Sequence, residues 1–175
     1  MVGGLIMARV STKENKNMYW QAREAMGLSR EAASEVLETI PPERIERIEN
    51  EKFLPHPDEV LLMAERYKAP MLCNYYCSQQ CPIGREYVPE IKIKDLSQIV
   101  LEMLASLNSM QRQTTRLIDI AADGVIDNEE LKDFIHIQQE LEKISITVET
   151  LQLWSEQMLA TGKINMEQYN ALIGK

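Results

Sequence analysis

The chain has 175 residues, of which 45% are hydrophobic and 6% aromatic, and its formal net charge at pH 7 is −8. This length suggests one or two small domains, and a composition with few glycines and prolines favours a mostly helical protein with an apolar core. Nucleic-acid-binding proteins are usually basic, so the overall charge argues mildly against DNA. The acidity is uneven, because residues 91–175 carry thirteen acidic and eight basic side chains, and residues 1–70 carry twelve and ten.

Residues 1–16 show no helical periodicity and are predicted to form a flexible, locally basic arm. Its apolar start is too short for a membrane span and lacks the pattern of a secretory signal. We therefore expect a cytoplasmic protein without membrane contact, in which thiols stay reduced.

Four short helices are predicted over residues 17–69. The first covers residues 17–26 and stops at Gly27, since glycine tolerates the left-handed conformation that ends helices. Ser29 is a good N-cap for the second helix, residues 29–37. Proline suits a first helical turn, so Pro41 and Pro42 open the third helix, residues 41–50, and Pro57 and Asp58 open the fourth, residues 58–67.

The order of apolar and charged residues in GLSREAASEVL, PPERIERIEN and LPHPDEVLLMAERY is specific. It resembles the helix-turn-helix domain of phage-repressor-type (XRE/Cro-like) transcription regulators. The matching residues are Leu28, Ser29, Glu31, Ala32 or Ala33, Ile45, Arg47, Ile48, Glu49, Asn50, Pro55, Leu61 and Ala64. The resemblance implies that residues 17–69 form a DNA-binding domain, that double-stranded DNA is the partner and that the protein acts as a homodimer on paired half-sites.

The third helix would be the recognition helix, with Ile45 and Ile48 on the core and its other side turned outward. An arginine fork matches guanine O6 and N7, so Arg44 is a candidate base reader. A helix start attracts phosphate. The predicted DNA-contacting residues are Ser29, Arg30, Glu43, Arg44, Arg47 and Asn50.

Two departures from the family pattern support an alternative. The turn between the second and third helices contains no glycine and is one residue longer, and the third helix exposes Glu43 and Glu46, which phosphates repel. The alternative is a protein-interaction or metal/redox-sensing adaptor on a helix-turn-helix scaffold, with weak or no DNA binding.

All three cysteines, Cys73, Cys77 and Cys81, lie in a predicted Cys-bearing segment and linker at residues 70–90. On a straight helix their spacing covers about 12 Å, too long for one zinc ion with sulfur ligands at about 2.3 Å. A helix broken near Ser78 would bring them together, with His56 as the nearest fourth ligand, whereas His136 is expected at the surface. The alternatives are structural packing, zinc or an iron–sulfur cluster, and thiol redox sensing. The run LCNYYC…CPIG after such a domain resembles a group of small bacterial regulators from anaerobic Firmicutes.

Residues 91–175 are predicted to form a long antiparallel helical hairpin that serves dimerisation or contact with an effector. Two amphipathic stretches, of which the first has about 28 residues, are joined by a short turn and followed by a final helix at residues 164–173. The turn, Asp119 to Glu130, imitates a calcium loop but has Ala121 at a ligand position. A capping box made by Asp127 and Glu130 explains the same residues without a cation.

The sequence thus predicts an all-α protein, with a repressor-type helix-turn-helix domain followed by the hairpin. No phosphate-binding glycine loop, nucleophile elbow or His-Glu-x-x-His motif is found, so we do not expect an enzyme.

Overall fold

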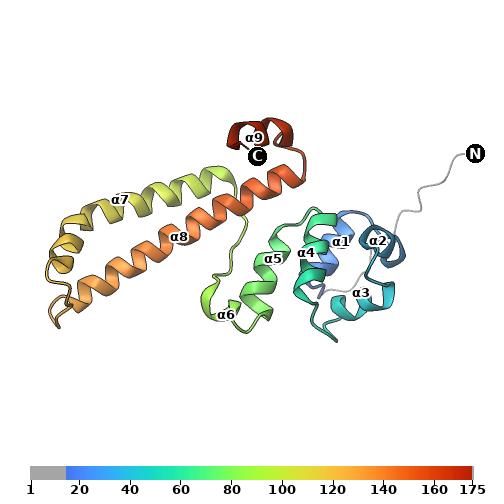
Figure 1. The fold of residues 1–175 in the computed structure, drawn as a ribbon, viewed down its shortest axis with the longest axis horizontal. Coiled ribbons are helices and arrows are strands. Elements are labelled where there is room, and N and C mark those ends of the chain that lie inside the picture. Colours follow the sequence, from blue (N-terminus) through green and yellow to red (C-terminus); the bar gives the residue numbers. More distant parts are fainter. Residues whose placement is uncertain (1–14, 175) are drawn as a thin grey trace, which may run out of the picture. The chain divides into compact units, whose positions relative to one another are not determined.

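A computed structural model describes residues 15–174, and most of the predicted arm lies outside these residues. Within this range every regular element is helical (Figure 1), which confirms the predicted all-α class. Backbone contacts divide the chain into two compact units. The N-terminal unit comprises the described residues up to Glu90 and those from Glu156 onward, and the hairpin unit comprises Ile91–Ser155.

The N-terminal unit begins with four short helices, α1 (Met18–Ala25), α2 (Arg30–Leu37), α3 (Pro42–Glu49) and α4 (Pro57–Arg66). The side chain of Ser29 caps α2 as predicted, accepting a hydrogen bond from Ala32 N at 3.1 Å. Asn17 does the same for α1. One buried apolar cluster joins the four helices to the following segment, and it consists of Tyr19, Ala33, Leu37, Ile40, Ile45, Ile48, Val60, Met63, Ala64, Tyr67 and Leu72.

Each of the four short helices is followed by a residue with positive φ. Gly27 has this conformation after α1, with φ of 69°. After α2, α3 and α4 it falls on Glu38, Glu51 and Lys68, with φ of 59°, 57° and 54°. Glu38 therefore adopts, in the α2–α3 turn, a backbone conformation that glycine adopts without strain.

The cysteine segment continues from α4 as α5 (Met71–Tyr75), which runs directly into a π-helical turn, η1 (Tyr76–Gln80). A further short helix, α6 (Gly84–Tyr87), packs on η1. The predicted Cys-bearing segment and linker at residues 70–90 therefore has helical elements as far as Tyr87, and extended backbone begins at Val88.

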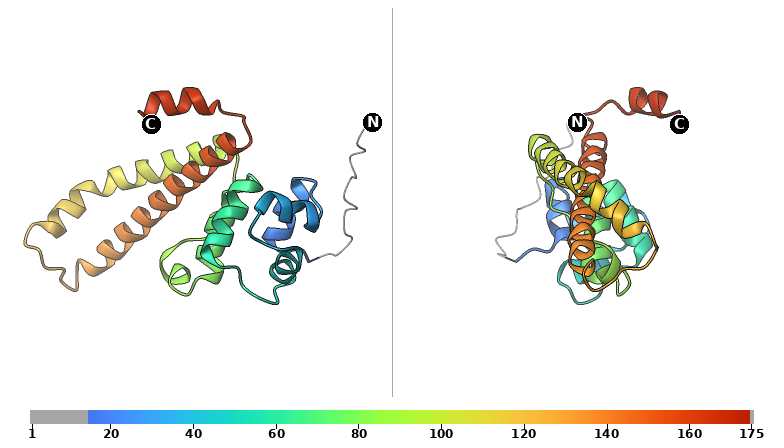
Figure 2. Two further views of the ribbon diagram at one scale, coloured as in Figure 1. Left: turned by 45° about the vertical axis from the view of Figure 1, so that its right-hand side comes forward. Right: turned by 90° about the vertical axis from the view of Figure 1, so that its left-hand side faces the viewer.

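The hairpin consists of α7 (Leu96–Ala121) and α8 (Leu131–Ala160), which lie side by side and antiparallel in Figures 1 and 2. The predicted long hairpin is confirmed, with 26 residues in its first helix and Asp95 as its N-cap. A final short helix, α9 (Met166–Ile173), follows. None of the helices within residues 15–174 combines the length and apolar character needed to cross a membrane.

The hairpin buries few side chains for its length. Its buried positions include Ile99 and Ile120 of α7 and, in α8, Ile137, Glu140, Thr147, Thr150 and Leu153. The threonine hydroxyls donate to backbone carbonyls of their own helix. Large apolar side chains meanwhile remain exposed along both helices.

Candidate functional site

The third helix, α3, buries one side and exposes the other. Ile45 and Ile48 are each about 1% exposed within the apolar cluster. Glu43, Glu46 and Arg47 face solvent. Because isoleucines three residues apart lie on one helix face, the outward side of α3 is the one that the sequence assigns to DNA.

Arg44, the predicted guanine reader, is engaged within the protein. Its Nε donates to Glu59 Oε1 at 2.9 Å and its Nη2 donates to Glu59 Oε2 at 2.7 Å, which makes a bidentate pair. The same Nη2 also donates to the backbone oxygen of Leu54 at 3.0 Å. Arg44 therefore holds the start of α4 against α3, and a base would have to compete with a carboxylate for it.

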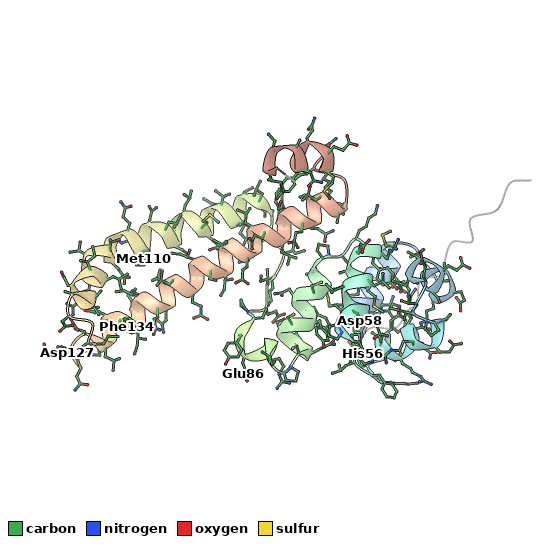
Figure 3. All side chains as sticks on the ribbon, viewed as in Figure 1. His56, Asp58, Glu86, Met110, Asp127 and Phe134 are labelled. Atoms are coloured by element: carbon green, nitrogen blue, oxygen red, sulfur yellow. The ribbon has the colours of Figure 1, made fainter. Side chains whose placement is uncertain are left out.

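The same contacts change the pKa of the Glu59 carboxyl. Burial acts to raise the pKa of this carboxyl, but the hydrogen bonds from Arg44 and from the backbone N–H of His56 outweigh burial, so the pKa is lowered. Glu59 is ionised at neutral pH and accepts from the residue that precedes its own helix, as in a capping box. His56 and Asp58 lie together at the start of α4 (Figure 3).

Two further predicted residues lie on α3. The guanidinium of exposed Arg47 sits 5.7 Å from the ring centroid of Phe53. Asn50 ends the helix, and its Nδ2 donates to the backbone oxygen of Glu46 at 2.9 Å. Arg47 thus contacts an aromatic ring, whereas Arg30 and Arg44 each pair with a carboxylate.

At the start of α2, Arg30 is held between an aromatic ring and a carboxylate. Its guanidinium carbon lies 4.9 Å from the ring centroid of Trp20, and its Nε donates to Glu49 Oε2 at 2.9 Å. Ser29 beside it is used as the N-cap. The two residues predicted to meet phosphate therefore both have roles inside the domain.

Glu49 links these helices, a role that was not predicted from the sequence. Glu49 is almost fully buried and accepts a bidentate pair from Arg23 of α1, at 2.5 and 2.9 Å, in addition to the bond from Arg30. Asn17 adds a second link by donating to the backbone oxygen of Ile48 at 2.8 Å. Glu49 follows Ile45 by four residues and so falls on the buried face of α3, a signal that the helical period offered.

The surface beside α3 is more acidic than a DNA-binding surface usually is. Exposed Glu43, Glu46 and Glu51 outnumber the exposed cations Arg47 and Lys52. Phe53 and Leu54, in the loop after α3, are both more than half exposed. Acidic side chains around exposed apolar ones are more typical of a protein-binding surface than of a phosphate-binding one.

The three cysteines are free thiols of intermediate burial. Cys73 lies in α5 and Cys77 in η1, while Cys81 has left the helix, with φ of −77° and ψ of 123°. Burial, followed by the proximity of Cys77 and Glu156, raises the pKa of the Cys73 thiol, which disfavours the reactive thiolate. The helix therefore widens at Ser78 and ends at Cys81, instead of breaking at Ser78 as the metal hypothesis requires.

The cysteine segment makes packing contacts and hydrogen bonds, and its geometry is not that of a metal site. Gly84 lies against the backbone of Cys77, and its N–H points to Cys81 Sγ at 3.4 Å. Tyr19 of α1 donates to Gln80 Oε1 at 2.8 Å. Within residues 15–174, no three His, Cys, Asp or Glu side chains are grouped so that they could hold a metal ion. The predicted zinc or iron–sulfur site thus gains no support from this geometry.

The turn between α7 and α8 has the geometry of a cap. Asp127 Oδ1 accepts from the N–H groups of Glu129 and Glu130 at 2.7 and 2.8 Å, and Glu130 Oε2 accepts from Asp127 N at 3.4 Å. Asp127 lies at this end of the hairpin in Figure 3. The reciprocal bonds are those of the predicted capping box, so the acidic residues of the turn are explained by helix initiation.

No family model matches the chain, and it has no significant match among the curated proteins or the solved structures.

Proposed function

We propose that the protein is a DNA-binding transcription regulator, in which α2 and α3 act as a helix-turn-helix and α3 faces the major groove. The observation that carries the proposal is the packing of α3. It contacts both α1 and α2, buries Ile45 and Ile48, and leaves Glu43, Glu46 and Arg47 exposed. A recognition helix needs such support on one side and access on the other.

The conformation of Glu38 adds support. The family pattern that the sequence resembles has glycine in the turn between these two helices, and Glu38 takes a positive φ at the end of α2. The longer turn thus keeps a backbone feature for which glycine is usually selected.

In the proposed complex, Arg47 is the base-reading residue. Arg44 stays paired with Glu59 and would have to leave that carboxylate to contact a base. We expect duplexes to be enriched from a random library at low salt, and R47A to weaken binding of the selected duplex about tenfold or more. R112A, which removes an exposed arginine from α7, is the matched control and should leave affinity nearly unchanged. Failure of the folded protein to enrich any duplex at about 50 mM salt would overturn the proposal.

A second function is favoured by the acidic and apolar surface beside α3. The exposed side chains of Phe53 and Leu54, bordered by Glu43, Glu46 and Glu51, fit a protein partner with a basic or apolar surface. On this hypothesis the α2–α3 scaffold presents a protein-binding surface instead of reading DNA.

Glu59→Gln separates the two functions. It removes the carboxylate that holds Arg44 and lowers the negative charge near α3, so a DNA-binding protein should bind its selected duplex more tightly, by roughly threefold to tenfold. A protein-interaction domain should show no such gain. Fluorescence anisotropy on the selected duplex, with E59Q and E43Q compared, distinguishes release of Arg44 from a simple change of charge.

A further inference from the structure

The hairpin unit has an apolar face that its own two helices do not cover. On α7 the exposed large side chains Leu96, Val100, Leu104, Leu107 and Ile118 recur at intervals of three, four or eleven residues. These intervals are multiples of the helical turn, so the five side chains form one stripe. The stripe is separate from Ile99 and Ile120, which are buried.

The second helix contributes to the same face. Leu141 and Val148 of α8 are both about 45% exposed and lie seven residues, or two turns, apart. Counting about 100° per residue from the buried positions of each helix puts them on the side of the hairpin that carries the α7 stripe. The opposite side has a shallow recess lined by Glu102, Ala105, Ser106, Lys143, Ile146 and Thr147, none of which is a large exposed apolar side chain.

The composition of α7 is unusual for a helix that faces water on most of its circumference. Among its 26 residues the charged ones are Glu102, Arg112, Arg116 and Asp119. Its other polar residues are serine, threonine, asparagine and glutamine, which cost less than charged residues to remove from water. Low charge and an apolar stripe that is densest from Leu96 to Leu107 together indicate a surface that is covered in the working protein.

The size of the face fits a second copy of this chain. A helix of 26 residues is about 39 Å long, and two helices side by side are about 20 Å wide, so one whole side of the hairpin, apolar and polar positions together, measures roughly 800 Å². That is about what one partner contributes to a standard stable interface. We propose that two chains associate through this face, which we call the Leu104 face, to form a four-helix bundle. This goes beyond the proposed function and does not depend on DNA binding.

Charge selects the orientation of the two hairpins. The tip, residues 119–133, carries one lysine, Lys132, against Asp119, Asp123, Asp127, Glu129, Glu130 and Asp133. The base carries Lys92 and Lys94 together with Asp95 and Glu149, and Lys94 is paired with Glu102, so this end is close to neutral. A parallel bundle would place two strongly acidic tips together, within the distance over which charges interact at physiological salt, whereas an antiparallel bundle keeps the two tips at opposite ends. The bundle is therefore antiparallel.

The mass of the full chain in solution tests the association. Sedimentation equilibrium at micromolar concentration should give twice the 20.1 kDa of one chain. The double variant L104D/L107D places charges in the Leu104 face and should weaken association roughly 100-fold or more, with an unchanged helical circular-dichroism spectrum. The control L61D/L172D makes the same change at exposed leucines of the N-terminal unit and should remain dimeric. A monomeric wild type at about 100 μM, or a control that dissociates as the variant does, would overturn the proposal.

Zero-length carbodiimide cross-linking tests the orientation. Lys92 and Lys94 lie at the opposite end of α7 from Glu129 and Glu130, about 39 Å away within one chain. A covalent amide between these lysines and these glutamates can therefore form only between two chains, and mass spectrometry should find it in the cross-linked dimer. A dimer that yields no such base-to-tip peptide would overturn the antiparallel arrangement, and DNA binding has no part in either result.

Discussion

The N-terminal unit and the hairpin unit both bury a glutamate, and they differ in what surrounds it. Glu49 is held by Arg23 and Arg30, which are themselves largely buried and come from two other helices. Glu140 is held by Lys143, whose side chain is 60% exposed and lies one turn further along the same helix. Glu140 also accepts a hydrogen bond from the side chain of Ser109 on α7. The first carboxylate therefore binds two arginines from other helices, whereas the second binds a neutral hydroxyl and an exposed lysine.

The difference follows from the lengths of the helices. Four helices of eight to ten residues can surround a common centre, so their apolar sides meet in one closed cluster and polar links fasten their ends. Two helices of 26 and 30 residues can meet only along a line. Their apolar surface exceeds what that line can cover, so the rest stays exposed within the single chain, and a second chain is proposed to cover it.

Removing each buried glutamate should show the largest contrast. Glu49→Ala leaves Arg23 buried without its carboxylate, so we expect a loss of about 3–5 kcal/mol in the free energy of unfolding. Glu140→Ala frees a lysine that is already in water and a neutral serine hydroxyl, so the loss should be much smaller. Urea unfolding followed by circular dichroism measures both. Equal losses would show that the two carboxylates play the same part.

The cysteine segment tests how far the close packing of the N-terminal unit extends. A Cβ added at Gly84 would lie 2.1 Å from the carbonyl oxygen of Cys77, so α6 and η1 could not keep their distance. We expect Gly84→Ala to destabilise the protein by about 1–3 kcal/mol. Arg85→Ala, at the neighbouring exposed position, should change stability by less than about 0.5 kcal/mol. A tolerated alanine at position 84 would mean that the segment is loosely attached.

The α2–α3 turn offers a smaller effect of opposite sign. Because Glu38 has a positive φ, Glu38→Gly relieves backbone strain while adding freedom to the unfolded chain, and the net gain should be about 0.5–1 kcal/mol. Glu35→Gly, inside α2, should instead lose about 1 kcal/mol. Thermal unfolding distinguishes the two, and a loss at position 38 would show that the glutamate side chain matters more than the backbone.

The smallest effect depends on pH. The folded-state pKa of Glu59 is lowered, so its ionised carboxyl stabilises the protein above the unfolded-state pKa of about 4.3, and this contribution is lost as pH falls through the folded-state value. The free energy of unfolding of the wild type should exceed that of Glu59→Gln by less than about 1 kcal/mol at pH 7, and this difference should vanish in acid. Arg44→Met should remove the same pH-dependent part. A difference that stays constant down to pH 3 would contradict this origin.

Local signals in the sequence were sufficient for the helices and their caps. Ser29, Asp127 and Glu130 bind backbone groups two or three residues away, so their roles follow from spacing alone. The partners of Glu49 and Arg44 could not be predicted in this way. Their partners are 26 and 15 residues distant, and only the folded arrangement brings them together.

The cysteine segment marks another limit. A run of helical residues does not reveal where an α-helix widens into a π-turn, because the widening depends on how Gly84 and Tyr19 pack against it. The spacing of Cys73, Cys77 and Cys81 therefore left open whether the helix breaks near Ser78, and the structure shows a π-turn over Tyr76–Gln80 that ends at Cys81. The stripe on α7 was visible as a period, but whether one partner helix would cover it depended on the lengths of both helices.

The pairing of Arg30 with Glu49 and of Arg44 with Glu59 has a consequence for the ionic atmosphere of the proposed DNA complex. An arginine that keeps its carboxylate brings little net positive charge to a phosphate, so it displaces few of the cations condensed on the duplex. Affinity should then fall only gently with added salt, by roughly one power of the salt concentration for each cation such as Arg47 or Lys52 that approaches unaccompanied. The protein would then distinguish one DNA sequence from another by short-range contacts, and its long-range electrostatic attraction to the duplex would be weak.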